Sequence, residues 1–527
     1  MLTDNQKEAL EFQRHISVTA NAGAGKTFVL VRRFVDILMK TDTHVNELVA
    51  ITFTEKAASE LRKKIADYIE ERIYSNPGSG ELIKLERIRD QLISSNIGTI
   101  HSFCAQILRE YPIEAGVDAA FTVLEGVDQQ IAEQDSVHET FEAILNDATE
   151  IKRAEELRYL VRTLGRYTVE RYLSIFLAKR ELVERFLQDG ACLDERIEEE
   201  KIIQRWDEIL ISAILERLTD SLFRSSLERV IQTASGKTSN EVKDIYSSWA
   251  TNLKPDETIR IYAQMANLIF TQKDIPRKEF LGSSTANPQI ENDLAVIVEC
   301  QKNISKPIKS FETDKVLKGN KILLQSLRVL LDVFRVAISR YDGKKQEYAY
   351  LDFEDILIKA KILLCKDEVR DAIAKKFKFI MVDEFQDTNR LQYEILQTLV
   401  SNYQSGNLFI VGDPKQSIYG FRDAEVEIFE SAKEEILTKA NGKGVILAES
   451  YRLLPNLIDF VNRLFSKIIV PKGSRYEVRY DELVQGRQSA GEGTVELMMV
   501  PVDDNAHNGE FTESGNDASN FVQDECR

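Results

Sequence analysis

The chain has 527 residues, 43% of them hydrophobic and 29% charged, and its formal net charge is −17. This composition excludes disordered and collagen-like classes and indicates a globular protein of two to four domains. The negative total argues against a passive, histone-like binder of nucleic acid, although a local groove can still be positive.

Membrane, secreted and metal-cluster proteins are also not expected. No stretch approaches the ~20 uninterrupted apolar residues of a membrane-spanning helix. The segment MLTDNQKEAL has neither the basic start nor the apolar stretch of a secretion signal. The five cysteines are scattered and form no C-x-x-C pair. We therefore expect no zinc or iron–sulfur site, and reduced thiols in a cytoplasmic protein.

The first predicted elements are a buried strand at 15–20 (HISVTA) and an amphipathic helix at 26–40, joined by a glycine-rich turn. Such a turn forms an anion site, because backbone N–H groups and the helix dipole converge on phosphate oxygens. Lys26 would reach the β- and γ-phosphates, and the Thr27 hydroxyl would take a Mg²⁺ position. Ala20 replaces the first Gly of G-x-x-x-x-G-K-[ST], so a turn without a ligand is the alternative. The predicted loop consists of Ala20, Asn21, Ala22, Gly23, Ala24, Gly25, Lys26 and Thr27.

Strand-like and helical segments alternate towards both ends of the chain, whereas the middle is helical. A turn-rich loop is predicted at 75–80, and 112–348 carries charged-apolar helical patterns with few Gly or Pro. The expected strands are 15–20, 48–53, 97–100, 377–382, 407–411 and 444–448, with helices at 55–73 and 101–111 among those between them. This order predicts an α/β fold whose parallel sheet is interrupted by a large helical insertion. Near the C-terminus we expect an exposed loop at 503–520 and a helix from 518 onward.

Two carboxylates, Asp383 and Glu384, directly follow the apolar run 377–382. A strand that ends in two acids suits Mg²⁺–nucleotide chemistry, in which one carboxylate holds the metal and the next polarises the attacking water. An acidic surface loop is the alternative, but it does not explain two acids placed immediately after a buried strand. The sequence therefore predicts ATP hydrolysis, with ATP and Mg²⁺ as cofactors.

Eight sequence blocks in a fixed order extend this interpretation. They are LTDNQ at 2–6, ANAGAGKT at 20–27, ITFTEKAA at 51–58, TIHSFC at 99–104, LDFED at 351–355, VDEFQDTN at 382–389, VGDPKQSIYGFR at 411–422 and ESYR at 449–452. Their order resembles that of UvrD/Rep-type superfamily 1 DNA helicases. Within these, the TIHSFC block and the downstream PIEAG point to the AddA/RecB branch of helicase–nuclease subunits.

The resemblance implies a role for several polar and aromatic side chains at the nucleotide. Gln6 would read the adenine edge, Tyr451 would stack on the base, Arg452 would meet the γ-phosphate as an arginine finger, and Gln416 would sense that phosphate. An ordinary surface glutamine is the alternative for Gln6, and a helix cap with a surface ion pair is the alternative for Tyr451 and Arg452.

The resemblance also implies the catalytic groups and a groove for DNA. Asp383 would be the Mg²⁺ ligand together with Thr27, and Glu384 would be the general base. Hydroxyls and aromatic platforms suit a motor that walks on one strand. The residues expected to contact single-stranded DNA are Phe53, Thr54, His101, Tyr419 and Phe421. Phe53 could instead be a core residue at the end of its strand.

The predicted organisation has three parts. A RecA-like motor domain comprises 1–111 and 349–442, a helical domain comprises 112–348, and the incomplete start of a second RecA-like domain comprises 443–527. The implied function is ATP-dependent 3′-to-5′ translocation on single-stranded DNA and unwinding of duplex ends in double-strand-break repair, and the implied partner is a second helicase–nuclease subunit. The alternatives are an ATP- and DNA-binding module without turnover, an RNA-directed helicase, and a regulatory assembly protein whose insertion binds a partner.

Overall fold

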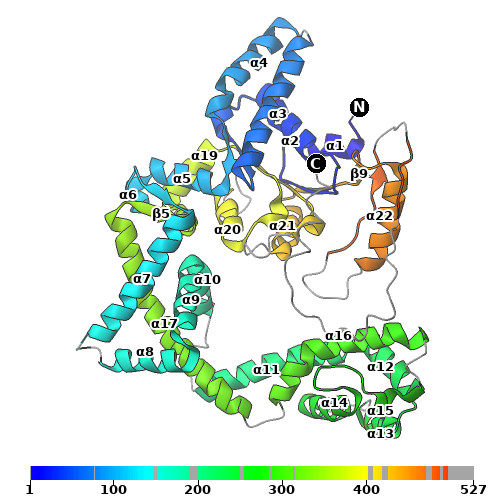
Figure 1. The fold of residues 1–527 in the computed structure, drawn as a ribbon. Helices are drawn as coiled ribbons and strands as arrows, with labels where there is room; N and C mark the ends of the chain where they lie inside the picture. Colours follow the sequence, from blue (N-terminus) through cyan, green and yellow to red (C-terminus); the bar gives the residue numbers. More distant parts are fainter. Residues whose placement is uncertain are drawn as a thin grey trace, which may run out of the picture. The chain divides into compact units, whose positions relative to one another are not determined.

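The computed structural model describes residues 2–75, 77–147, 149, 151–189, 199–249, 254–283, 288–311, 315–400, 407–417, 425–469, 478–486 and 491–496. The chain forms two compact units. One unit comprises Met1–Ala115 with Lys359–Arg527, and the other comprises Gly116–Ile358. We call them the sheet unit and the helical unit (Figure 1). The loop and helix predicted beyond residue 502 lie outside the described residues.

The sheet unit is built on six parallel strands in the order β3-β2-β6-β7-β1-β8. Their bounds are β1 Ile16–Ala20, β2 Leu48–Thr52, β3 Asn96–Thr99, β6 Phe379–Val382, β7 Asn407–Gly412 and β8 Lys443–Leu447. A parallel sheet is buried on both faces, and β1, β2 and β7 are buried along their whole length. The predicted α/β class with a parallel sheet is confirmed, and each predicted strand lies within two residues of an observed one.

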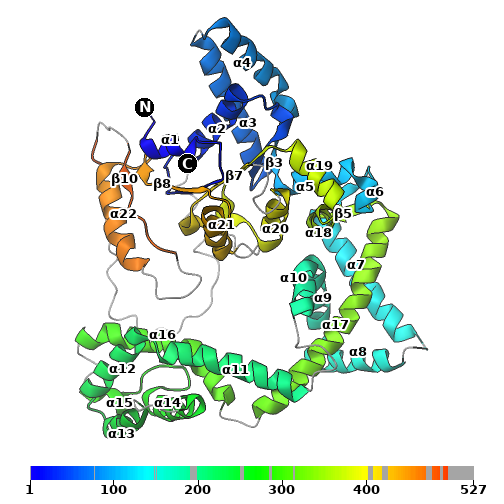
Figure 2. The same cartoon turned by 180° about the vertical axis from the view of Figure 1, so that it is seen from behind.

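Helices cover both faces of this sheet, as Figure 2 shows from behind. The helices of the sheet unit are α1 Asp4–Ala9, α2 Lys26–Lys40, α3 Glu55–Tyr74, α4 Ser79–Gln91, α5 Ile100–Glu110, α6 Pro112–Ala115, α19 Asp367–Lys376, α20 Arg390–Leu399, α21 Val426–Thr438 and α22 Pro455–Ile468. On one face, α2, α3 and α4 share a core with alternate strand residues such as Ile16, Val18 and Ala20. This packing fixes the strand ends from which the candidate site is built.

Two sequence expectations need correction in this unit. Strand β8 pairs in parallel with β1 from Ile16↔Lys443 to Ala20↔Leu447, so 443–447 completes the first sheet instead of opening a second domain. The apolar residues Val445 and Leu447 join the core of that sheet, which gives the physical reason. The turn predicted at 75–80 is shorter, because α4 already begins at Ser79 with Gly78 at its N-cap. A small parallel pair, β9 Glu449–Ser450 and β10 Val484–Gln485, follows the sheet.

The helical unit contains long helices and one short strand pair. Its helices are α7 Gly126–Asn146, α8 Ile151–Leu164, α9 Arg166–Ala178, α10 Arg180–Asp189, α11 Glu199–Leu218, α12 Ser221–Thr233, α13 Ser239–Trp249, α14 Pro255–Ile269, α15 Lys278–Leu281, α16 Pro288–Phe311 and α17 Lys315–Glu347. One core joins α7, α8, α9 and α17, and another joins α11 to α16. The parallel strands β4 Thr122–Leu124 and β5 Tyr350–Asp352, absent from the sequence prediction, join the two ends of the unit, and α18 Phe353–Leu364 follows.

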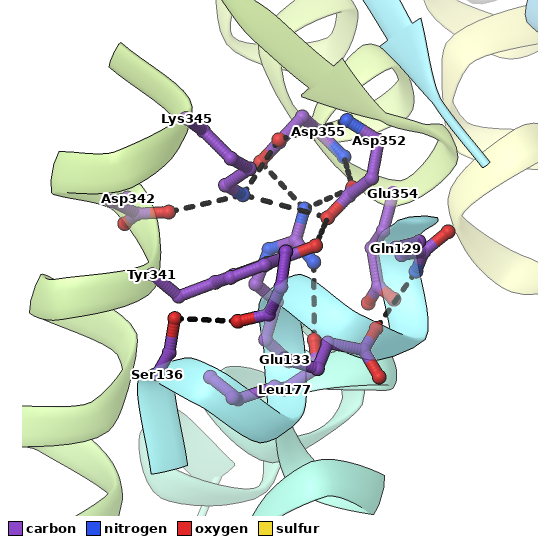
Figure 3. A network of polar contacts seen from close by, with 12 residues as sticks. Gln129, Glu133, Ser136, Leu177, Tyr341, Asp342, Lys345, Asp352, Glu354 and Asp355 are labelled. Atoms are coloured by element: carbon purple, nitrogen blue, oxygen red, sulfur yellow. Dashed lines mark hydrogen bonds and ion pairs between the residues drawn. The ribbon is translucent and has the colours of Figure 1, made fainter. Parts of the chain in front are cut away.

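A buried ionic network lies at the β5 end of the helical unit (Figure 3). Arg180 donates to Asp352 and Asp355 at 2.5 Å each, and Lys345 donates to Asp355 at 2.6 Å. The Tyr341 hydroxyl donates to Asp352 at 2.9 Å. Burial alone would raise the pKa of Asp352, but the charges of Arg180 and Lys345 outweigh it and hold that pKa at about 2. The network therefore ties α10 and α17 to the start of α18 with two cations and two carboxylates.

Among the described residues, no helix combines the length and the apolar character that crossing a membrane requires.

Candidate nucleotide-binding site

The candidate site lies at the edge of the sheet where the parallel strands end. β1 leads into the loop 21–25, β6 into Asp383 and Glu384, β7 into Asp413, and β8 towards Tyr451. Because all six strands are parallel, these segments meet at the same edge, which is where ligands bind in open α/β sheets. Residues far apart in the sequence are thereby brought together.

The glycine-rich loop has the backbone that its sequence predicts. Gly23 and Gly25 have φ of 77° and 85°, a region that favours glycine, and Gly25 is the N-cap of α2. Ala20 is the last residue of β1 and is buried, and Asn21 donates its N–H to the Leu447 carbonyl at 3.1 Å. Alanine in place of the first glycine is therefore tolerated, because residue 20 is still part of β1 and not of the turn. Ala22 is exposed, and Ala24 is buried beneath the loop.

The segment after β8 lies directly on this loop. Tyr451 donates its N–H to the Gly23 carbonyl at 3.0 Å. A Cβ at Gly23 would lie 2.8 Å from the Cβ of Arg452, so only glycine allows this approach. The side chain of Arg452 is exposed and that of Tyr451 half-buried. The structure thus brings two predicted nucleotide residues beside the loop.

Gln6 belongs to the same group. It is 3% exposed, so the alternative of an ordinary surface glutamine is wrong. Its Oε1 accepts from the Thr3 N–H at 3.2 Å, and its side chain also hydrogen-bonds to Tyr451. A Cβ at Gly25 would lie 3.5 Å from the Gln6 Nε2. Gln6 therefore lies between the loop and Tyr451, with one end of its amide engaged by the capping box of α1.

A buried arginine holds the chain that leads from Gln6 to the sheet. Arg33 on α2 is completely buried and donates to the carbonyls of Ala9 (3.1 Å) and Glu11. It also donates to the Asn407 Oδ1 at 2.9 Å, and its guanidinium lies 4.6 Å from the centre of the Phe409 ring. Burial lowers the pKa of Arg33 to about 9, partly opposed by Glu11. This arginine received no role from the sequence, because its partners are mainly backbone carbonyls.

The centre of the site is an ion pair between the loop and the end of β6. Lys26 Nζ lies 2.6 Å from the Glu384 Oε2, and the lysine side chain is only 12% exposed. The same oxygen accepts from Gln386 Nε2 at 2.9 Å. Glu384 has φ of 50°, a strained value for a residue with a side chain. The predicted phosphate lysine and the predicted base are therefore in direct contact.

Carboxyl groups crowd around this ion pair. Burial, and then the charge of Glu384, raise the pKa of Asp383 to about 6, against the opposing charge of Lys26. The same causes raise the pKa of Asp387 to about 6. The Asp387 Oδ1 is buried and has no hydrogen-bond partner among the described residues. A site with this excess of carboxylate is suited to a cation.

The residues present fit a Mg²⁺ ion that is shared with a nucleotide. In the described parts of the chain, no group of three or more His, Cys, Asp or Glu side chains could hold a metal by itself. Mg²⁺ in nucleotide enzymes instead uses one or two protein ligands plus phosphate oxygens. The candidates in this chain are Asp383, which follows β6, and Thr27, which lies in the first turn of α2.

The remaining predicted residues are Gln416 and the expected DNA contacts. Gln416 follows β7 and donates its Nε2 to the Asp413 Oδ2 at 2.6 Å. Half-buried Phe53 and exposed Thr54 follow β2, and Thr54 caps α3 by accepting from the Ala57 N–H at 3.1 Å. Half-buried His101 stands at the start of α5, which follows β3. Tyr419 and Phe421 lie outside the described residues.

Sequence reasoning missed Gln386, Asp387 and Asp413, although all three lie inside blocks that it quoted. Gln386 joins Glu384 to the Asp413 N–H, and Asp413 is almost completely buried. Their place in the sequence could have indicated them, because each of the three follows a predicted strand by a few residues. The sequence could not show which of these side chains face one another.

Comparison with known proteins gives consistent matches. The sequence profile of the UvrD/REP helicase N-terminal domain matches residues 2–436. The chain is 27% identical over 526 residues to the A subunit of the ATP-dependent helicase/nuclease of Natranaerobius thermophilus, an alignment that covers 92% of this chain and 39% of that protein. It is 26% identical to the protein of the same name from Listeria monocytogenes (95% and 42% covered), and 27% identical to that from Bacillus velezensis (97% and 43%). The chain thus spans about two fifths of the length of these relatives.

Proposed function

Because the chain belongs to the UvrD/REP helicase family, we propose that it carries the ATP-binding motor of a DNA helicase. This motor would move 3′ to 5′ along single-stranded DNA and unwind duplex ends during double-strand-break repair. The relatives, which are named as subunits of a helicase/nuclease, support a setting in which a second helicase–nuclease subunit is the partner. A cytoplasmic location belongs to the same proposal.

The observation that carries the proposal is the contact between Lys26 and Glu384. It joins the end of β1 to the end of β6, 358 positions later in the sequence, at 2.6 Å. A phosphate bound at the loop would attract Lys26 and release the carboxylate of Glu384 from this ion pair. Glu384 would then be available to accept a proton from the attacking water.

The other residues would hold the nucleotide and report its presence. Tyr451 would stack on the base beside Gln6, and Arg452 would reach the γ-phosphate from the segment that lies on the loop. Gln416 would respond to the same phosphate. Bound Mg²⁺ would neutralise charge on the phosphates, with Thr27 and Asp383 as its protein ligands.

The contacts to DNA are proposed from the position of strand ends. The residues after β2 and β3 lie at the same sheet edge as the candidate nucleotide site. Such placement would let a change at the nucleotide alter affinity for a strand, which is the requirement for stepping. The proposed DNA residues are Phe53, Thr54 and His101, together with Tyr419 and Phe421.

ATP hydrolysis by the chain, with and without single-stranded DNA, tests this proposal. Glu384→Gln should lower kcat about 100-fold or more and leave ATP affinity nearly unchanged, because it removes the base and keeps the shape. Lys26→Ala should abolish hydrolysis. Lys40→Ala is the matched control, since Lys40 lies at the other end of α2 in an exposed ion pair with Asp36.

Two of the alternative functions have their own outcome in the same assay. Stimulation by RNA in place of DNA would indicate an RNA-directed helicase. ATP binding without turnover would indicate a binding module. Parental turnover by Glu384→Gln would contradict the assignment of the base.

A further inference from the structure

A buried amide connects the candidate base to the next strand of the sheet. Gln386 is 2% exposed. Its Nε2 donates to the Glu384 Oε2 at 2.9 Å, and its Oε1 accepts from the Asp413 N–H at 3.0 Å. Both ends of one side chain are therefore bonded to groups at the carboxyl ends of β6 and β7. Since a buried amide without partners is costly, this arrangement fixes the orientation of Gln386.

The connection continues to the candidate phosphate sensor. Asp413 is 1% exposed, and its carboxylate accepts from the Gln416 Nε2 at 2.6 Å and from the Lys415 N–H at 3.1 Å. An unbroken series of polar contacts thus leads from the loop to the end of β7. Its members are Lys26, Glu384, Gln386, Asp413 and Gln416.

Strand β7 leaves room for this amide. Gly412 is the last residue of β7, and a Cβ there would overlap the Gln386 Oε1. That Cβ would also lie 3.1 Å from the Gln386 backbone nitrogen and 3.0 Å from the Phe429 ring. A larger residue at position 412 would therefore have to displace the Gln386 amide, which packs against the backbone of β7.

We propose that Gln386 is a positioning residue for ATP hydrolysis, which holds the Glu384 carboxylate and links it to Gln416. The role rests on the proposed function. Glu384 Oε2 has two donors, and a γ-phosphate that attracts Lys26 leaves Gln386 as the donor that remains. Because the strained backbone of Glu384 must be held by its surroundings, this bond keeps the carboxylate directed at the nucleotide.

The decisive variant is Gln386→Met, which keeps the volume and removes the hydrogen bonds to Glu384 and Asp413, together with a longer one to Asp387 at 3.4 Å. We expect kcat to fall about 10- to 100-fold while KM and ATP affinity change less than about threefold. Because Gln386 acts through Glu384, the double variant Gln386→Met/Glu384→Gln should be no slower than Glu384→Gln alone. A purely structural role would instead make the two losses multiply. Gln386→Met at the parental rate, or multiplying losses, would overturn the proposal.

Two further variants keep the test sharp. Gly412→Ala should reproduce the kcat loss of Gln386→Met without changing Gln386 itself, since it displaces the amide. Gln392→Met is the matched control and should keep the parental rate, because the Gln392 side chain caps α20 by accepting from the Asn389 N–H and takes no part in the series that links Glu384 to Gln416. Normal turnover by a folded Gly412→Ala chain would count against the role of Gln386.

The outcome remains informative if the chain binds ATP without turnover. In that case the measured quantity is the ratio of the affinities for ATP and ADP. Gln386→Met should lower this ratio about fivefold or more, which is within the usual range of coupling between two sites. An unchanged preference would overturn the proposal. If the parental chain bound no ATP, the proposed function would be wrong. The role of Gln386, which depends on that function, would then be wrong as well.

Discussion

The helical unit and the sheet unit each contain a cluster of charged side chains, and the two clusters differ in how their buried carboxylates are paired with cations. In the helical unit, Arg180 and Lys345 face Asp352 and Asp355, and all four side chains are at most 9% exposed. Each of the two aspartates pairs with both cations, and Lys345 also pairs with the more exposed Asp342 at 3.1 Å. The pKa of Asp352 accordingly lies at about 2, although burial acts to raise it.

In the sheet unit, Lys26 contacts Glu384, and its charge also acts on Asp383 and Asp387. Its direct partner Glu384 has a side chain that is 38% exposed. The pKa values of Asp383 and Asp387 are both raised to about 6, first by burial and then by the charge of Glu384. In the first cluster, the cations hold the pKa of Asp352 low, whereas in the second cluster Asp383 and Asp387 keep raised pKa values that an added cation would lower.

Removing one cation, Arg180 or Lys26, should give the largest difference in stability between the two clusters. Arg180→Met should lower the free energy of unfolding by about 3–5 kcal/mol, because it leaves two carboxylates buried without their main partner. Lys26→Met should cost less than about 1 kcal/mol, since the side chain of its direct partner Glu384 is 38% exposed and stays solvated without the lysine. Urea unfolding of both variants measures the difference. Arg171→Met, at an exposed position of α9, is the control, and equal losses for Arg180 and Lys26 would contradict the distinction.

The same substitution in the two clusters should have opposite signs. Asp355→Asn should destabilise the chain by roughly 3 kcal/mol, because it removes a charge that Arg180 and Lys345 need. Asp387→Asn should stabilise it by roughly 1 kcal/mol at pH 8. The folded-state pKa of Asp387 is raised to about 6, so the stability that this group contributes at low pH is lost as pH rises through 6. The gain should therefore vanish near pH 4, and thermal unfolding at both pH values checks it.

Glu354 lies close to Arg180 and Asp352 in the cluster of the helical unit and shows what burial does to a carboxyl group there. Its carboxylate accepts from the Glu181 N–H at 2.8 Å, and burial raises its pKa to about 7. Its contribution to stability is therefore greatest below its ordinary pKa and is lost as pH rises through 7. Glu354→Gln keeps an acceptor for Glu181, so it should raise stability by roughly 1 kcal/mol at pH 8 and change nothing at pH 4.5. A gain that is equal at both pH values would show that the charge of Glu354 is not its cause.

Much of the sheet unit could be predicted from local sequence. The strand at β1, the loop and the full extent of α2 follow from an apolar run, two glycines and one amphipathic stripe. These signals are local, because each depends on residues within one or two turns of one another. The pairing of β8 with β1 was not predictable in this way, since a short apolar strand suits either of two sheets equally well.

The contacts within the helical unit could be predicted less well from the sequence. Its helical character follows from periodicity, but the block LDFED gave no sign that Asp352 and Asp355 are ionic partners of Arg180. Those contacts join positions 172 and 175 residues apart. Charged residues are common in helices, and only their burial distinguishes these from solvated ones.

The amino-acid sequence is enough to identify the kinds of residues at the site and their order along the chain: the glycine-rich loop, Lys26, and the acids after an apolar strand. Only the folded chain shows which of them are in contact, including Lys26 with Glu384, Gly23 with Tyr451, and Gln386 with Asp413. A strand can be recognised from residues that are neighbours along the chain, whereas the order of the strands depends on packing across the whole sheet. Until that order brings the carboxyl ends together, the side chains have no common site.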